Sequence, residues 1–280
     1  TQDLTQAFEW FLKAANNGHL PAMNNLGLCY YDGEGVTQDL TKAFEWYLKA
    51  ANNGDADAMF NVALCYDDGE GVTQDKVKAY EWYLKAANNG YVDAMFNVAI
   101  CYKNGEGVAK NWVKACEWYL KAANNGNDEA MNVVGDYHIS GNGMRCDETQ
   151  ALEWYLKAAK NGNADGMFNV GMCYDKGQGT IKDKTLAFDW YLKAANNGCV
   201  DAMMIVAKWF SEGKGVPQSD QKAFEWYLQA AKHNNAQAAH KVTQCYSKGR
   251  GVSRDTKEAK KFSQKAKDLG YTDESSCANQ

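Results

Sequence analysis

Small and apolar residues recur within residues 57–66 at the spacing of one face of a helix. Ala58, Met59 and Val62 recur at three- and four-residue steps, with polar residues between them. Apolar positions spaced in this way are typical of an amphipathic helix. Gly69 is expected to end the helix, because glycine readily adopts the left-handed backbone conformation found at helix C-termini.

A second helix is predicted from Val77 to Asn88. Asp75 precedes it and is suited to act as its N-cap, because an aspartate side chain accepts hydrogen bonds from the first free amides of a helix. We expect Glu81 and Lys85 to form an ion pair on its outer face, one helical turn apart. One broad stripe of this helix holds Ala79, Trp82, Tyr83, Ala86 and Ala87.

The two-helix pattern returns every 36 residues without insertion or deletion. A fixed period of this size predicts stacked supersecondary units rather than one globular core. We expect an unpaired second helix in residues 1–18, seven helix pairs in residues 19–270, and a disordered tail in residues 271–280. The start within a repeat indicates a fragment of a longer protein. The caps equivalent to Asp75 are Asp3, Asp39, Asn111, Asp147, Asp183, Ser219 and Asp255.

These positions resemble the SEL-one-like repeat family, a relative of the tetratricopeptide repeat. The resemblance covers nearly the whole chain and recurs seven times. It implies an all-α, right-handed superhelical solenoid with a role as a scaffold or adaptor. The residues that match the family pattern in one repeat are Ala58, Ala63, Tyr66, Gly69, Gly71, Val72, Ala79, Trp82, Tyr83, Lys85, Ala86, Ala87 and Gly90.

If the units stack as in tetratricopeptide repeats, the first helix of each pair lines a concave groove. Side chains on that face that the core does not need are then candidates for binding a peptide. Exposed aromatic residues commonly anchor such interfaces, and asparagine can both donate and accept hydrogen bonds to a peptide backbone. The predicted groove residues are Phe60, Asn61, Leu64, Phe96, Asn97, Ile100, Phe168, Asn169 and Met172.

Structural roles for the same residues remain open. The asparagines equivalent to Asn61 can instead bond a neighbouring loop, and Phe60, Phe96 and Phe168 can pack under the next unit. Acidic residues in the first turn of the first helices, such as Asp57, are favoured there by the helix dipole without any ligand.

Charge is distributed unevenly along the chain. Residues 1–144 hold 19 acidic and 10 basic residues, whereas residues 145–280 hold 16 and 20. This asymmetry suggests weak head-to-tail self-association. A basic cluster near the C-terminus lacks interleaved aromatic residues, and the isoelectric point is near 5.5, so nucleic acid is not an expected partner.

Most of the nine cysteines occupy one repeat position, where Tyr137 and Trp209 stand in other units. We therefore expect buried, unpaired thiols and a reducing, cytoplasmic location. The scattered histidines and the absence of Cys-x-x-Cys spacing favour neither a metal nor a cofactor. No apolar run reaches the length of a membrane span.

The sequence thus predicts a non-enzymatic scaffold that binds a protein or peptide in its groove. Nothing in it supplies the nucleophile, base or metal cluster of an enzyme. The other hypothesis is a regulatory repeat module of a larger protein, for example one fused to a kinase or another catalytic domain.

Overall fold

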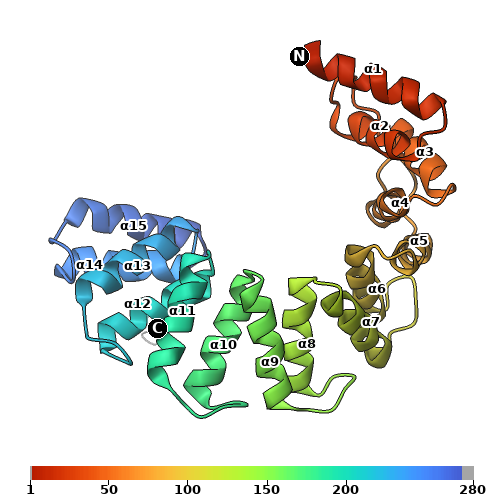
Figure 1. The fold of residues 1–280 in the computed structure, drawn as a ribbon. Helices are drawn as coiled ribbons and strands as arrows, with labels where there is room; N and C mark the ends of the chain where they lie inside the picture. The colour runs from red at the N-terminus through yellow and green to blue at the C-terminus, as the bar shows by residue number, and fades with distance from the viewer. Residues whose placement is uncertain (1, 273–280) are drawn as a thin grey trace, which may run out of the picture. The chain divides into compact units, whose positions relative to one another are not determined.

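The computed structural model describes residues 2–272, and this part of the chain contains only helices and connecting loops (Figure 1). Most of the tail that was expected to be disordered, residues 273–280, lies outside the described residues. None of the described helices is both long and apolar enough to cross a bilayer. The helices are α1 (Gln2–Asn16), α2 (Leu20–Asp32), α3 (Leu40–Ala51), α4 (Ala56–Asp68), α5 (Lys76–Asn88), α6 (Val92–Asn104), α7 (Trp112–Asn124), α8 (Asp128–Ser140), α9 (Glu148–Lys160), α10 (Ala164–Lys176), α11 (Lys184–Asn196), α12 (Val200–Glu212), α13 (Asp220–Lys232), α14 (Ala236–Lys248) and α15 (Thr256–Asp268).

The helices form two compact units, an amino-terminal unit of residues 1–146 and a carboxy-terminal unit of residues 147–280. Within each unit every helix packs against its neighbours in sequence. The first helix of a repeat contacts its own second helix, as α4 contacts α5, and the second helix contacts the next repeat, as α5 contacts α6. The prediction of an all-α solenoid of helix pairs is confirmed.

Most of the second helices have an N-cap side chain at the predicted position. Asp75 Oδ1 accepts hydrogen bonds from the amides of Val77 and Lys78, both at 3.1 Å. One predicted cap differs: Asp3 lies inside the first turn of α1, which already begins at Gln2. The other predicted caps of second helices are confirmed, namely Asp39, Asn111, Asp147, Asp183, Ser219 and Asp255.

Two glycines shape the loop between the helices of one repeat. Gly69 ends α4 with a left-handed φ of 78°, as predicted. Gly71 also has a positive φ, 71°, and it lies directly against the backbone carbonyl of Leu40 at the start of α3. Gly71 therefore does more than tighten its own loop, because it sets the contact between one repeat and the preceding one.

The core of each repeat is built from small and β-branched residues around one tyrosine. A valine in the first helix is completely buried, as Val62 is in α4, and Tyr83 of α5 is 2% exposed. Burial of one such side chain contributes about 1.5–3 kcal/mol. The cysteines that share one repeat position are buried and unpaired, which agrees with their expected role: Cys29, Cys65, Cys101, Cys173 and Cys245.

The lysines on the outer face of the second helices pair with tryptophan rather than glutamate. Lys85 Nζ lies 3.8 Å from the centre of the Trp82 ring, and the described ion pairs do not include one between Glu81 and Lys85. The predicted ion pair is therefore wrong. The tryptophan is only half-buried, so its open face is available three residues before the lysine and attracts the ammonium group. The same contact recurs for Lys13, Lys49, Lys121, Lys157 and Lys193.

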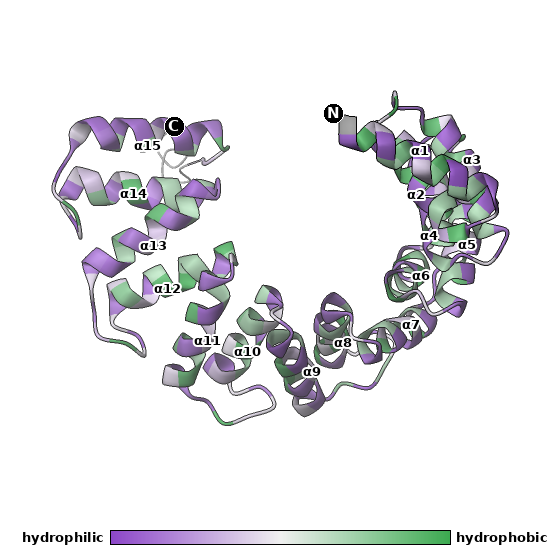
Figure 2. Ribbon diagram, turned by 45° about the horizontal axis from the view of Figure 1, so that its top comes forward, coloured by the Kyte–Doolittle hydropathy of each residue, from purple (hydrophilic) through white to green (hydrophobic). Residues whose placement is uncertain are grey.

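The last described helix, α15, consists mostly of hydrophilic residues (Figure 2). Only Ala259 and Ala266 are buried in it. α15 therefore packs on α14 through a narrow stripe of small residues.

Candidate functional site

The predicted aromatic residues of the groove lie on the first helices, but each packs against a tyrosine. The centre of the Phe60 ring lies 5.7 Å from that of Tyr83 in its own repeat and 4.8 Å from that of Tyr91, the cap of the next first helix. Phe96 and Phe168 pack in the same way, with ring centres 5.3 Å from Tyr119 and 5.5 Å from Tyr191. All three phenylalanines are half-buried, so they support the repeat and leave part of each ring at the surface.

The predicted asparagines include one direct link between repeats. Asn61 Nδ2 donates to Asn24 Oδ1 at 2.9 Å, and Asn24 is only 8% exposed. The bond joins adjacent first helices, α4 and α2, so the proposed bond to a neighbouring loop is wrong for Asn61. Asn97 is half-buried on α6, and Asn169 is buried on α10.

Two of the predicted residues, Asn61 and Leu64, line a cavity between consecutive repeats of the amino-terminal unit. Its volume is about 160 Å³. Leu28 of α2 forms its apolar wall together with Leu64 and is 39% exposed. We call this cavity the first cleft. Its walls are Leu28, Tyr31, Tyr47, Asn61, Leu64, Cys65, Asp68 and Glu70.

The remaining predicted residues lie on other helices. Ile100 is half-buried on α6 of the amino-terminal unit, and Met172 is half-buried on α10 of the carboxy-terminal unit. The residues on α10 thus belong to a different compact unit from those on α4 and α6.

A polar contact at the rim of the first cleft was not predicted. The Tyr31 hydroxyl donates to Glu70 Oε2 at 2.6 Å. This bond to the carboxylate, together with burial, raises the pKa of Tyr31 to about 12. Tyr31 is in the last turn of α2, and Glu70 is in the loop of the next repeat. Their separation is 39 residues, one repeat plus one turn of helix.

The position of Tyr31 carries a carboxylate in two other repeats. Asp67 of α4 accepts a hydrogen bond from Lys76 Nζ at 2.6 Å and from the Tyr83 hydroxyl at 3.3 Å. Asp175 of α10 accepts one from Lys214 Nζ at 3.0 Å. In these repeats the chain therefore supplies its own anion at the position equivalent to Tyr31.

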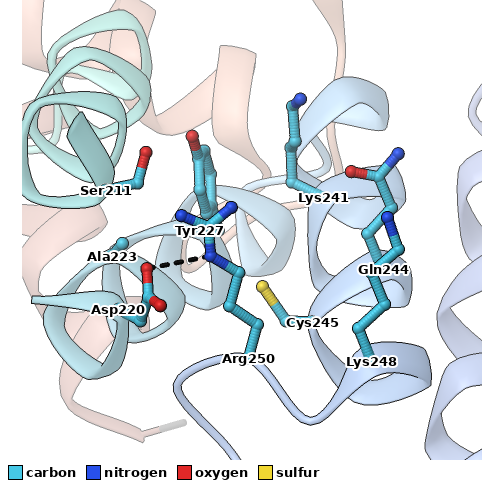
Figure 3. Close-up of a pocket in the computed structure, with 9 residues that line it drawn as sticks. All are labelled: Ser211, Asp220, Ala223, Tyr227, Lys241, Gln244, Cys245, Lys248 and Arg250. Atoms are coloured by element: carbon cyan, nitrogen blue, oxygen red, sulfur yellow. Dashed lines mark hydrogen bonds and ion pairs between the residues drawn. The ribbon is translucent and has the colours of Figure 1, made fainter.

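The equivalent cavity, between α12, α13 and α14, has the opposite charge from the first cleft. We call it the last cleft; its volume is about 110 Å³. Arg250 Nε donates to Asp220 Oδ1 at 2.9 Å. Lys241 and Lys248 replace Asn61 and Asp68 of the first cleft, while Arg250 replaces Glu70. The lining residues are Ser211, Asp220, Ala223, Tyr227, Lys241, Gln244, Cys245, Lys248 and Arg250 (Figure 3).

The thiols at the repeat position of Cys65 are poorly suited to nucleophilic chemistry. Burial raises the pKa of Cys65 and Cys101 to about 12, and that of Cys173 to about 11. A thiol with such a pKa is protonated at neutral pH, and only the thiolate is a strong nucleophile. Within the described residues, no group of three or more His, Cys, Asp or Glu side chains could hold a metal ion.

Comparison with known proteins agrees with the helix pairs. The family model described as Sel1 repeat matches eight consecutive segments, from residues 1–19 to residues 236–271. Each full match spans one first helix and one second helix. Repeats thus account for the described residues, and no further domain is present between residues 2 and 272.

The solved structures similar to the chain include two Sel1 repeat proteins. One is c5321, a protective antigen of uropathogenic Escherichia coli with an SLR fold, at 33% identity and a TM-score of 0.83 over 97% of this chain. This chain spans 58% of the length of c5321. The other is a Sel1 repeat protein from Oxalobacter formigenes, at 29% identity and a TM-score of 0.85, with 95% of this chain and 77% of that chain covered. None of the curated proteins matches significantly.

Proposed function

The chain belongs to the Sel1 repeat family, and from this membership we propose that it is a non-enzymatic scaffold that binds a protein segment at the first cleft. Repeats of this family typically mediate protein–protein interaction, so a protein partner is the general expectation. The geometry of the first cleft supports it as the position of the bound segment.

The observation that carries the proposal is the open apolar wall of the first cleft. Leu28 and Leu64 lie on adjacent first helices and face the same cavity. Exposed leucine side chains are unfavourably hydrated. Covering them with another apolar group stabilises the complex by about 25 cal/mol per Å² of buried apolar area. An apolar side chain of a partner segment is the natural occupant.

Polar groups around this wall favour a peptide. The Asn61 amide has hydrogen-bonding capacity beyond its one bond to Asn24, because an amide side chain offers two donors and two acceptor lone pairs. Asp68 and Glu70 add negative charge at the rim. The cleft thus suits a segment with an apolar residue next to a basic one.

The test compares two polar substitutions in the cleft with one on another surface. Leu28→Asn combined with Leu64→Asn changes the apolar wall, and Val113→Asn changes a valine on α7 that is 55% exposed. A photo-reactive residue at position 28 first identifies the bound segment, and calorimetry then measures the affinity of that segment. The phenylalanines are unsuitable for this purpose, because truncation of Phe60 also removes its contacts with Tyr83 and Tyr91.

We expect the double cleft variant to bind at least about tenfold more weakly, since truncating a buried apolar anchor typically costs 1–2 kcal/mol or more. Val113→Asn should bind as the wild type does. Equal affinities for the two variants, or equal cross-linking from positions 28 and 113, would refute the proposal.

Two further properties, the location of the protein and its self-association, are proposed from the cysteines and from the distribution of charge. The buried free thiols support a reducing, cytoplasmic location. The excess of acid in residues 1–144 and of base in residues 145–280 supports weak head-to-tail self-association at low salt. Light scattering over a concentration series tests the second property, and a monomeric mass at every concentration and ionic strength excludes it.

A further inference from the structure

The last cleft lacks the carboxylate that other repeats place at its rim. Asp67 and Asp175 occupy this position in two earlier repeats, and each carboxylate accepts a hydrogen bond from a lysine. In the last cleft the position holds Ser211. Its hydroxyl donates at 2.9 Å to the Lys208 carbonyl of its own helix and is in hydrogen-bond contact with Tyr227, but it carries no charge.

Three cations nevertheless face this cleft. Lys241 and Lys248 line it without an ion-pair partner among the described residues. Arg250 uses its Nε for Asp220, and its guanidinium group is close enough to Tyr227 to interact with it electrostatically (Figure 3). An arginine has five N–H donors, so this single bond leaves most of them available.

The last cleft also contains a tyrosine hydroxyl, that of Tyr227. Its equivalent in an earlier repeat, Tyr83, donates to the carboxylate of Asp67 at 3.3 Å. Tyr227 lines the last cleft at the same repeat position. Arg250 likewise stands at the repeat position of Lys214, the donor to Asp175. The repeat position of Lys76 holds Asp220, which pairs with Arg250.

We propose that the last cleft binds the side-chain carboxylate of an acidic segment of a partner protein. The Asp or Glu side chain takes the place that Asp67 and Asp175 fill internally in their own repeats. Lys241, Lys248 and Arg250 neutralise it, and the arginine fork matches the planar carboxylate. A cavity of about 110 Å³ accommodates one such side chain.

Charge complementarity extends beyond the cleft and supports the same occupant. Residues 145–280 carry 20 basic and 16 acidic residues, so the surroundings attract an acidic segment over a range set by the Debye length, about 8 Å at physiological salt. This site is separate from the first cleft, which offers carboxylates of its own.

The experiment measures binding of a fluorescent, blocked hexapeptide rich in Asp and Glu to the full chain by anisotropy. Its matched probe replaces every Asp with Asn and every Glu with Gln. The test variant is Lys241→Gln with Lys248→Gln. The control is Lys257→Gln with Lys267→Gln, which removes the same charge from exposed positions on α15.

We expect the test variant to bind the acidic peptide about tenfold more weakly or worse, as loss of close charge pairs does at other interfaces. The control should stay within about twofold, since exposed charges at a distance are screened. The amide probe should not bind measurably.

A third variant, Ser211→Asp, restores the missing carboxylate. We expect it to abolish peptide binding and to fold as the wild type does by circular dichroism, because the chain already tolerates aspartate at this position in Asp67 and Asp175. Binding of the acidic peptide to Ser211→Asp at wild-type affinity would overturn the proposal.

Other results would contradict it as clearly. If the test and control variants lose the same affinity for the acidic peptide, the peptide is attracted only by the net charge of the chain. Displacement of the peptide by inorganic phosphate at similar concentration means a general oxyanion site. If the molecular mass of the wild type rises with concentration at physiological salt, and that of the Lys241→Gln, Lys248→Gln variant does not, a second copy of the chain is the occupant. None of these outcomes bears on the Leu28 and Leu64 variants, so the two proposals fail independently.

Discussion

Replacing Gly71 by alanine should weaken the contact between consecutive repeats. Gly71 combines a left-handed φ of 71° with direct contact to the Leu40 carbonyl of α3. Gly90 of the same unit also has a left-handed φ, 89°, but a Cβ there would meet nothing within 4 Å. The pair thus separates the cost of backbone conformation from the cost of crowding between repeats.

The magnitudes follow from these surroundings. An alanine forced into the left-handed region costs about 1–2 kcal/mol, partly offset by about 0.4–1 kcal/mol from the stiffer unfolded chain. Gly90→Ala should therefore lower the free energy of unfolding by about 1 kcal/mol. Gly71→Ala adds the overlap with the carbonyl of α3, and overpacking of this kind costs a further ~1–3 kcal/mol.

Urea unfolding of the full chain, followed by circular dichroism, measures the difference between these two variants. Hydrogen exchange of the amides in α3 and α4 locates it, since local opening need not involve the whole array. We expect faster exchange in these helices for Gly71→Ala only. Equal destabilisation by the two substitutions would show that the loop, and not the contact between repeats, requires glycine at position 71.

Three more predictions follow from single contacts. Lys85→Gln should cost ~0.5–1 kcal/mol of unfolding free energy in urea, because Lys85 lies over the Trp82 ring, and no cost would refute that contact. The pKa of Tyr31 is raised from 10 to about 12 by Glu70, so this bond stabilises the fold fully below pH 10 and is lost as the pH rises through 12. Tyr31→Phe should remove this part of the decline in denaturation curves measured from pH 9 to 12, while the part due to other buried tyrosines such as Tyr137 remains. In a chain whose final cysteine is replaced by serine, a thiol reagent should modify the exposed Cys146 first, and Cys146→Ser should remove this fast phase.

Positions that repeat without change were predictable, because their roles are local. An aspartate such as Asp75 caps the helix that it precedes, and Gly69 ends the helix that it follows. These residues act within a few positions of the chain, so periodicity and helix chemistry suffice to place them. The same reasoning gave the wrong partner for Lys85, because it compared only charges and ignored the open face of the neighbouring tryptophan.

The predicted groove was harder to obtain from the sequence, since its contacts cross between repeats. Asn61 bonds Asn24 and Glu70 bonds Tyr31, at separations of 37 and 39 residues. Neither distance is a whole period, so repeat alignment alone conceals the pairs. A search for complementary residues at one period plus three would have found both Tyr31 with Glu70 and Asp175 with Lys214.

Each cleft takes its walls from two consecutive repeats, and this has a consequence for how the chain encodes recognition. In the last cleft, Ser211 comes from one repeat and Arg250 from the next. The side chains of a cleft are therefore determined by a pair of consecutive repeats and not by one repeat alone. Exchanging the order of two intact repeats would preserve every helix, cap and core residue. It would nevertheless combine different side chains in the clefts between repeats.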